Sequence, residues 1–162
     1  MNAVDVLKYG NLTVLHTLDG VPISEWETGG VCGVWSVKDI IAHLASFEHM
    51  LVDLLNSFLD GGPTPCLDEY RELGVQFNDA QVALRQSKSP QEVLAEYKDT
   101  QAQVMELVKH IPQETIRQPG TLPWYGMEYD LEDFLVYTFY GHKREHCAQI
   151  NVFRDQLGLT NP

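Results

Sequence analysis

Several features are scarce in this sequence, and each scarcity excludes a class of protein. Only 11 Lys and Arg stand against 23 Asp and Glu, which gives a formal net charge of −12. Such a chain lacks the clustered positive charge that a nucleic-acid backbone or an anionic membrane surface attracts. No apolar run approaches the roughly 20 residues of a membrane span. We therefore expect neither a nucleic acid nor a membrane as partner.

Cysteine is scarce as well. The three cysteines, Cys32, Cys66 and Cys147, are an odd number without CxxC spacing. Such cysteines are typical of reduced thiols and not of a disulfide framework. Residues 1–10 contain no basic segment followed by an apolar one, so no signal peptide is expected. These features predict a cytoplasmic protein.

The chain has the length of one domain. Its 162 residues, 44% of them hydrophobic, can build one sizeable core but not two. No repeat, low-complexity tract or linker divides the sequence. We expect a single domain over residues 1–162.

Helical periodicity dominates the first half of the chain. Residues 3–19 carry an apolar stripe that Gly20 ends. A second helix begins at Ser36, because Asp39 lies three residues later and the pair resembles a capping box. Its apolar stripe continues to Phe58 and ends before a Gly-Gly-Pro sequence. Two long amphipathic helices are predicted here.

The second half adds further helices. The pattern over residues 67–86 is weak and predicts a broken or short helix. Ser89 and Glu92 form another capping box, which starts a long helix that ends at about Ile111. After a loop over residues 112–129, a last helix is expected over residues 130–157. The sequence therefore predicts an all-α protein.

Two histidines interrupt the apolar stripe of the last helix. His142 and His146 are one turn apart and project from the same side of the helix, with Gln149 beside them. They could be core histidines that bond to polar neighbours or face a wet cleft. They could also be a metal clamp, because side chains at i and i+4 can bind one ion.

A third histidine favours the metal clamp. His43 lies at the edge of the apolar stripe of the second helix, where an unpaired imidazole would be costly. If the two helices are neighbours, His43 completes a three-nitrogen site with His142 and His146. The other three histidines are predicted at the surface: His16, His49 and His110.

The segments around these histidines carry a resemblance to a known family. Trp35-Ser36-Val37-Lys38-Asp39-Ile40-Ile41-Ala42-His43-Leu44, with Glu48 after it, resembles the second-helix signature of the DinB/YfiT-like superfamily. Tyr140-Gly141-His142-Lys143-Arg144-Glu145-His146-Cys147-Ala148-Gln149-Ile150 is similar to its last-helix motif. The resemblance covers most of the chain in architecture and two helices in motif.

This resemblance implies a fold, a cofactor and a choice of activities. The fold would be a four-helix bundle with a long crossover and an extra short helical segment, often found as a homodimer. One divalent metal ion, Zn²⁺ or Ni²⁺ in many members, would be held by His43, His142 and His146. Branches of the family transfer low-molecular-weight thiols, isomerise maleylpyruvate with a thiol cofactor, or disarm a toxic metabolite.

Other side chains near the histidines have alternative roles. Glu48 is a candidate catalytic base or a partner of a ligand, and it could equally be a carboxylate bonded to a neighbouring helix. Glu145 borders the histidine face as a supporting or solvated group. Cys147 lies about 100° from His146 around the helix and is rejected as a ligand.

The candidate site supports three hypotheses for function. Three protein ligands leave positions open for water or substrate, which is typical of catalytic metal sites. The first hypothesis is a metal-dependent enzyme of thiol-transferase or hydrolase type that acts on a small molecule. The second is a protein that binds or sequesters a small molecule without turnover, as in toxin resistance. The third is a purely structural bundle.

Overall fold

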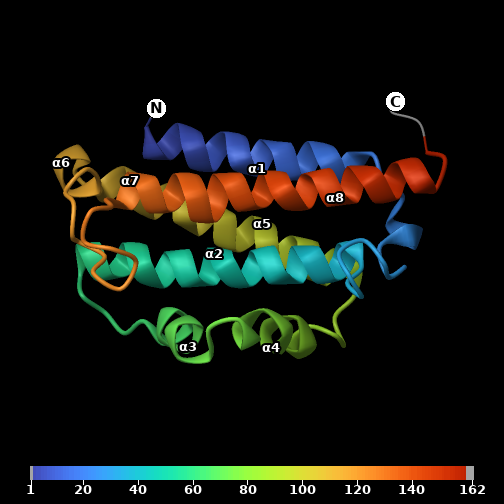
Figure 1. The fold of residues 1–162 in the computed structure, drawn as a ribbon, viewed down its shortest axis with the longest axis horizontal. Helices are drawn as coiled ribbons and strands as arrows, with labels where there is room; N and C mark the ends of the chain where they lie inside the picture. Colours follow the sequence, from blue (N-terminus) through green and yellow to red (C-terminus); the bar gives the residue numbers. More distant parts are fainter. Residues whose placement is uncertain (1, 160–162) are drawn as a thin grey trace.

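The computed structural model describes residues 2–159 and is built of helices. Over these residues it contains no β-strand, and its one extended feature is an isolated bridge between Cys32 and Trp35. The all-α prediction is therefore confirmed. Four long helices lie roughly side by side (Figure 1): α1 (Ala3–Asp19), α2 (Val37–Leu59), α5 (Pro90–Leu107) and α8 (His142–Gln156).

Helix α2 begins at the predicted capping box. The Ser36 hydroxyl accepts the Asp39 N–H at 3.2 Å, and an Asp39 carboxylate oxygen accepts the Ser36 N–H at 3.0 Å. These bonds satisfy two donors that a helix N-terminus leaves free. The helix then packs along α5 on one side and against α3 and α4 on another. The packing of α2 fixes the position of His43, which lies in the second turn of that helix.

Two short helices form a crossover between α2 and α5. The predicted broken helix over residues 67–86 is α3 (Pro65–Leu73) with α4 (Gln76–Leu84) after it. The break falls at Gly74, whose φ of +54° is strained for residues with a Cβ. Because α3 and α4 carry the chain back along the outside, α2 and α5 run in the same direction (Figure 1).

The N-terminus of α3 is tied to α2. One Asp53 carboxylate oxygen accepts the backbone N–H groups of Cys66 at 2.6 Å and Leu67 at 3.2 Å. A carboxylate at this end also interacts favourably with the helix dipole. The crossover is thereby held against the helix that carries His43.

The last helix differs from the continuous α-helix that was expected. It begins as α7 (Leu131–Phe134), passes through a π-helix (Leu135–Gly141), and continues as α8. A π-turn holds more residues than an α-turn and changes the direction in which later side chains point, and such turns are frequent at functional sites. Leu157, the last residue of the expected helix, lies just after the end of α8 and is 38% exposed.

The predicted loop over residues 112–129 also contains structure. A single helical turn, α6 (Gln113–Ile116), lies just after a 3₁₀ turn (Val108–His110) that extends α5. Ile116 and Leu122 are buried and anchor the loop to the core. Within residues 2–159, no helix has the length and apolar character needed to cross a membrane.

The core consists of two hydrophobic clusters that meet at His43. Phe47 and Phe139 belong to one cluster, whereas Ile40 and Ile150 belong to the other. The His43 ring contacts Phe47 of the first cluster at a centroid distance of 4.8 Å. It also contacts Trp35, which packs on the second cluster, at 5.1 Å. The histidine is thus enclosed by apolar groups.

Candidate metal centre

Helices α2 and α8 bring the three predicted ligands to one point. The Nε2 atom of His142 lies 2.9 Å from Nε2 of His43 and 2.9 Å from Nε2 of His146. One ligand atom from each ring lies within 4.8 Å of the others. His43 and His146 are 2% and 6% exposed, and His142 is half-buried. The predicted convergence is confirmed, and these residues could hold a metal ion.

The outer ring nitrogens of His142 and His146 are already engaged. Nδ1 of His146 lies 2.8 Å from Oε1 of Gln149, and His142 is hydrogen-bonded to the backbone of Thr138. Because amide and carbonyl oxygens accept, both Nδ1 atoms carry the proton in this arrangement. Each Nε2 atom then presents a lone pair. Two acceptor lone pairs that face each other at 2.9 Å are favourably placed to bind a cation.

The ring of His43 also carries a nitrogen without a hydrogen-bond partner. Its Nδ1 atom is buried and has no hydrogen-bond partner among the described residues. A proton on that nitrogen leaves a buried donor unsatisfied, and its absence leaves a buried acceptor unsatisfied. His142 can accept a proton from only one neighbour through its Nε2 lone pair. The chain therefore cannot satisfy its three imidazoles from its own hydrogen bonds.

The donor set fits a divalent cation of borderline softness. Imidazole nitrogens bind Zn²⁺ at about 2.0–2.1 Å, and imidazole also suits Ni²⁺. Three neutral ligands that converge within a few ångströms can share one such ion. Gln149 and the Thr138 carbonyl occupy the second ring nitrogens, as groups that orient metal-bound histidines commonly do.

Burial keeps the three imidazoles neutral. It is the largest cause that lowers the pKa of His43, of His142 and of His146 below the ordinary value of 6.5. The neighbouring imidazoles lower the pKa values of His43 and His142 further. Because metals bind the neutral form, these side chains are ready to act as ligands at neutral pH.

Aromatic rings wall the cluster. The Phe47 ring lies 4.8 Å from the His43 ring and 4.8 Å from the His142 ring, centroid to centroid. Trp35 covers the other side of His43. Trp35 belongs to the segment just before α2, so the capping box that starts the helix also places this ring. Such walls exclude water and strengthen electrostatic interactions at the nitrogens.

Glu48 lies elsewhere on α2 and has a different partner. Its carboxylate is 0% exposed and lies 2.5 Å from Nζ of Lys143, whose side chain is 2% exposed. The Lys143 ammonium group also lies 5.7 Å from the centroid of the Tyr97 ring. Of the alternatives for Glu48, the contact with a neighbouring helix is the one observed. A catalytic role for Glu48 stays a prediction.

The importance of Lys143 was missed at the level of sequence, although a signal was present. Lys143, Cys147 and Ile150 are spaced i, i+4, i+7 and are all buried. This spacing marks one helix face, so a lysine on it needs a buried counter-charge. Cys147 lies on this face and outside the histidine cluster, as predicted.

The remaining candidates lie near the surface. His16 and His110 are exposed, as predicted. His49 corrects the prediction in part, since it is half-buried and its Nε2 atom lies 3.0 Å from Glu96. The reason is that α5 packs against this side of α2 and supplies a carboxylate. Glu145 is exposed and lines a cavity of 350 Å³ together with Gln149.

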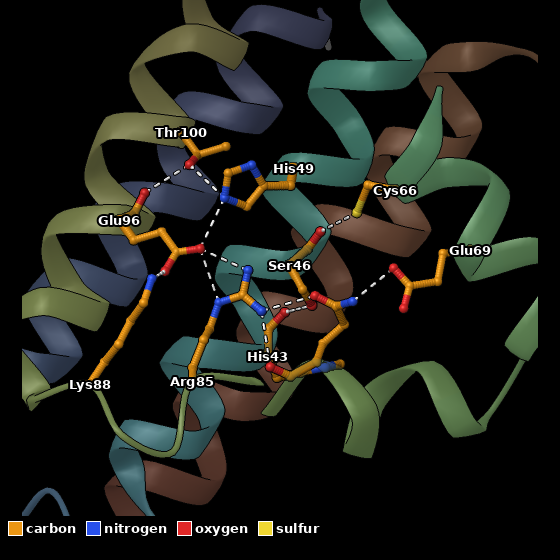
Figure 2. A network of polar contacts seen from close by, with 10 residues as sticks. His43, Ser46, His49, Cys66, Glu69, Arg85, Lys88, Glu96 and Thr100 are labelled. Carbon is orange, nitrogen blue, oxygen red and sulfur yellow. Dashed lines mark hydrogen bonds and ion pairs between the residues drawn. The ribbon is translucent and has the colours of Figure 1, made fainter. Parts of the chain in front are cut away.

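Glu96 is the centre of a separate polar network, which Figure 2 shows. Besides His49, its carboxylate accepts hydrogen bonds from Arg85 at 2.7 and 3.0 Å and from Lys88 at 2.7 Å. The hydrogen bond with His49, together with those from Arg85 and Lys88, lowers the pKa of the Glu96 carboxyl. The network ties α5 to α2 and to the residues after α4. Its donors and acceptors satisfy one another, so it does not require a ligand.

The fold and the site define a class: a helical protein with three histidines from two helices that could share one metal ion. Comparison with protein families then identifies the group. The family model described as the DinB superfamily matches residues 13–150, and the chain belongs to this superfamily. No curated protein and no solved structure matches the sequence.

Proposed function

We propose that this chain is a metal-dependent enzyme that acts on a small molecule, of thiol-transferase or hydrolase type. The observation that carries the proposal is the convergence of three buried or half-buried Nε2 atoms, with those of His142 and His146 facing each other as acceptors at 2.9 Å. A structural bundle gains nothing from such an arrangement, since buried polar groups without partners are costly. A bound divalent ion offsets that cost.

Each residue of the site has a defined part in the proposal. His43, His142 and His146 hold the ion, and Gln149 fixes the tautomer and orientation of His146. A Zn²⁺ or Ni²⁺ ion bound there would lower the pKa of a coordinated water or thiol and so supply a nucleophile near neutral pH. Phe47 and Trp35 give the His43 ring apolar surroundings.

The bundle topology, the cellular compartment and the oligomeric state that the family resemblance implies belong to the same proposal. We infer a bundle of four long helices with the α3–α4 segment as its long crossover, in a cytoplasmic homodimer. The free cysteines fit a reducing compartment. Sedimentation or light scattering of the purified protein tests the dimer, and a monomer at micromolar concentration would exclude it.

Metal analysis of the purified protein is the first test. We expect about one Zn²⁺ or Ni²⁺ per chain and its loss in His142→Ala, because only two protein ligands then remain. His16→Ala is the matched control, since that side chain is exposed on α1. Metal content near zero in the wild-type protein after reconstitution would favour the structural bundle and overturn the proposal.

Turnover is the second test, and it separates an enzyme from a sequestering protein. Metal-loaded protein is mixed with a low-molecular-weight thiol and a chloronitroarene, or with a nitrophenyl ester, and product absorbance is recorded over time. We expect turnover that disappears in His142→Ala. Stoichiometric ligand binding without turnover would favour the sequestering protein instead.

Glu48→Gln tests the proposed role of the carboxylate as a base. Loss of turnover in the folded fraction, with unchanged metal content, would support proton transfer by Glu48. Loss of stability together with retained turnover in the folded fraction would assign Glu48 to the ion pair with Lys143 alone.

A further inference from the structure

A cavity of 640 Å³ opens between the crossover helices and the loop that precedes α7. This volume lies within the range of small-molecule sites, about 300–1,000 Å³. Four of its lining residues are aromatic: Phe47, Tyr70, Trp124 and Tyr125. Arg71 is the only charged residue among the lining residues that the structure describes, and Asn78 adds an amide.

Phe47 connects this cavity to the histidine cluster. Its ring lies 4.8 Å from both the His43 and the His142 rings, and it is also a wall of the cavity. Tyr70 continues the wall, with its ring 5.8 Å from that of Phe47. The cavity therefore begins one aromatic ring away from the proposed metal ligands.

The positive charge of Arg71 is available to a ligand. It forms an ion pair with Asp68 at 4.0 Å, and the Arg71 side chain is 50% exposed. An exposed ion pair at that distance contributes little to the free energy of unfolding. The guanidinium group lies 5.8 Å from the centroid of the Trp124 ring, which holds it at the cavity wall. In a chain of net charge −12, this is a local positive site among apolar groups.

We propose that this cavity binds the substrate as a planar, apolar carboxylate, with Arg71 bound to the carboxylate group. Guanidinium binds carboxylate through two parallel hydrogen bonds, and the Asn78 amide can add another. The rings of Tyr70, Trp124 and Tyr125 supply flat apolar surface for the body of the ligand. The inference rests on the proposed function, because it names the substrate class for chemistry at the histidines.

Binding of naphthoate, measured by calorimetry against neutral naphthylmethanol, tests the cavity without any turnover. We expect naphthoate to bind at least about tenfold more tightly than the alcohol, as a charge-assisted contact would give. Arg71→Met should remove that preference and Arg71→Lys should retain part of it. Lys8→Met is the control, because it removes one exposed positive charge from α1. Equal binding of both probes, or an unchanged preference in Arg71→Met, would overturn the proposal.

Metal-free His142→Ala separates this inference from the proposed function. We expect this variant to keep the Arg71-dependent preference for naphthoate, because the cavity does not include the histidines. If His142→Ala loses naphthoate binding while Arg71→Met keeps it, the carboxylate sits on the metal and the assignment of Arg71 fails. If the protein binds no metal but keeps the preference, the metal-dependent function fails and the cavity stands.

Discussion

Helices α2 and α8 are joined by two sets of buried polar side chains that differ in kind. Glu48 and Lys143 carry opposite charges and pair with each other. The three histidines are neutral and direct one ring nitrogen each, Nε2, to the same point. The sets are neighbours in sequence on α8, at residues 142 and 143. The comparison teaches that two opposite charges compensate each other within the fold, whereas three converging neutral imidazoles offer their nitrogens to a ligand.

The largest effect on stability should come from breaking the ion pair between Glu48 and Lys143. In Lys143→Met, the Glu48 carboxylate is left buried and uncompensated. We expect the free energy of unfolding of metal-free protein to fall by about 3–5 kcal/mol. Denaturant titration measures it. Adding Glu48→Gln to the variant should restore most of the loss, and a change below about 1 kcal/mol in the single variant would contradict the prediction.

His142→Ala should act on the ligand and not on the fold. Without metal, we expect a small change in stability, since the variant removes an imidazole with unsatisfied neighbours. With free metal at about a thousand times its Kd, the wild-type protein should gain about 4 kcal/mol and the variant almost nothing. Thermal unfolding with and without Zn²⁺ measures both. Complete unfolding of metal-free protein would make the ion structural.

Gln149→Leu sharpens the comparison at one side chain. Gln149 orients His146 through the contact of 2.8 Å with Nδ1. Loss of such a partner weakens metal binding by about 10–100-fold, which corresponds to about 1.4–2.7 kcal/mol. Competition with a chelator of known affinity measures it. Gln156→Leu, on the exposed end of α8, is the control and should leave affinity unchanged.

When the pH is lowered, proton binding by the three histidines should be the first cause of lost stability. Their folded-state pKa values are lowered, so the unfolded chain binds protons at higher pH than the folded one. Metal-free stability should therefore be full above about pH 6.5 and fall below it, on the order of 1 kcal/mol between pH 7 and 6. Denaturant titrations at a series of pH values measure this slope.

The same protons compete with the ion. We expect metal occupancy to be high at neutral pH and lost toward about pH 5, as measured by metal content after equilibration. Flat, substoichiometric occupancy from about pH 8 to about pH 5 would contradict the three-histidine site.

Local signals in the sequence were sufficient for most helix starts. Ser36, Ser89 and Asp130 each form a capping box in the structure, because a cap and its partner are three residues apart. The inward placement of His43, His142 and His146 also came from helical spacing. The π-helix before His142 was not predicted, because periodicity assumes a uniform turn.

The sequence by itself determined which elements form and which histidines face inward, since both depend on residues within one or two turns. Only the tertiary structure decided that Lys143 pairs with Glu48, that Glu96 binds His49, and that residues from α2, α3 and a distant loop line one cavity. These contacts join segments far apart in the chain. They depend on how helices pack, and no local pattern encodes that.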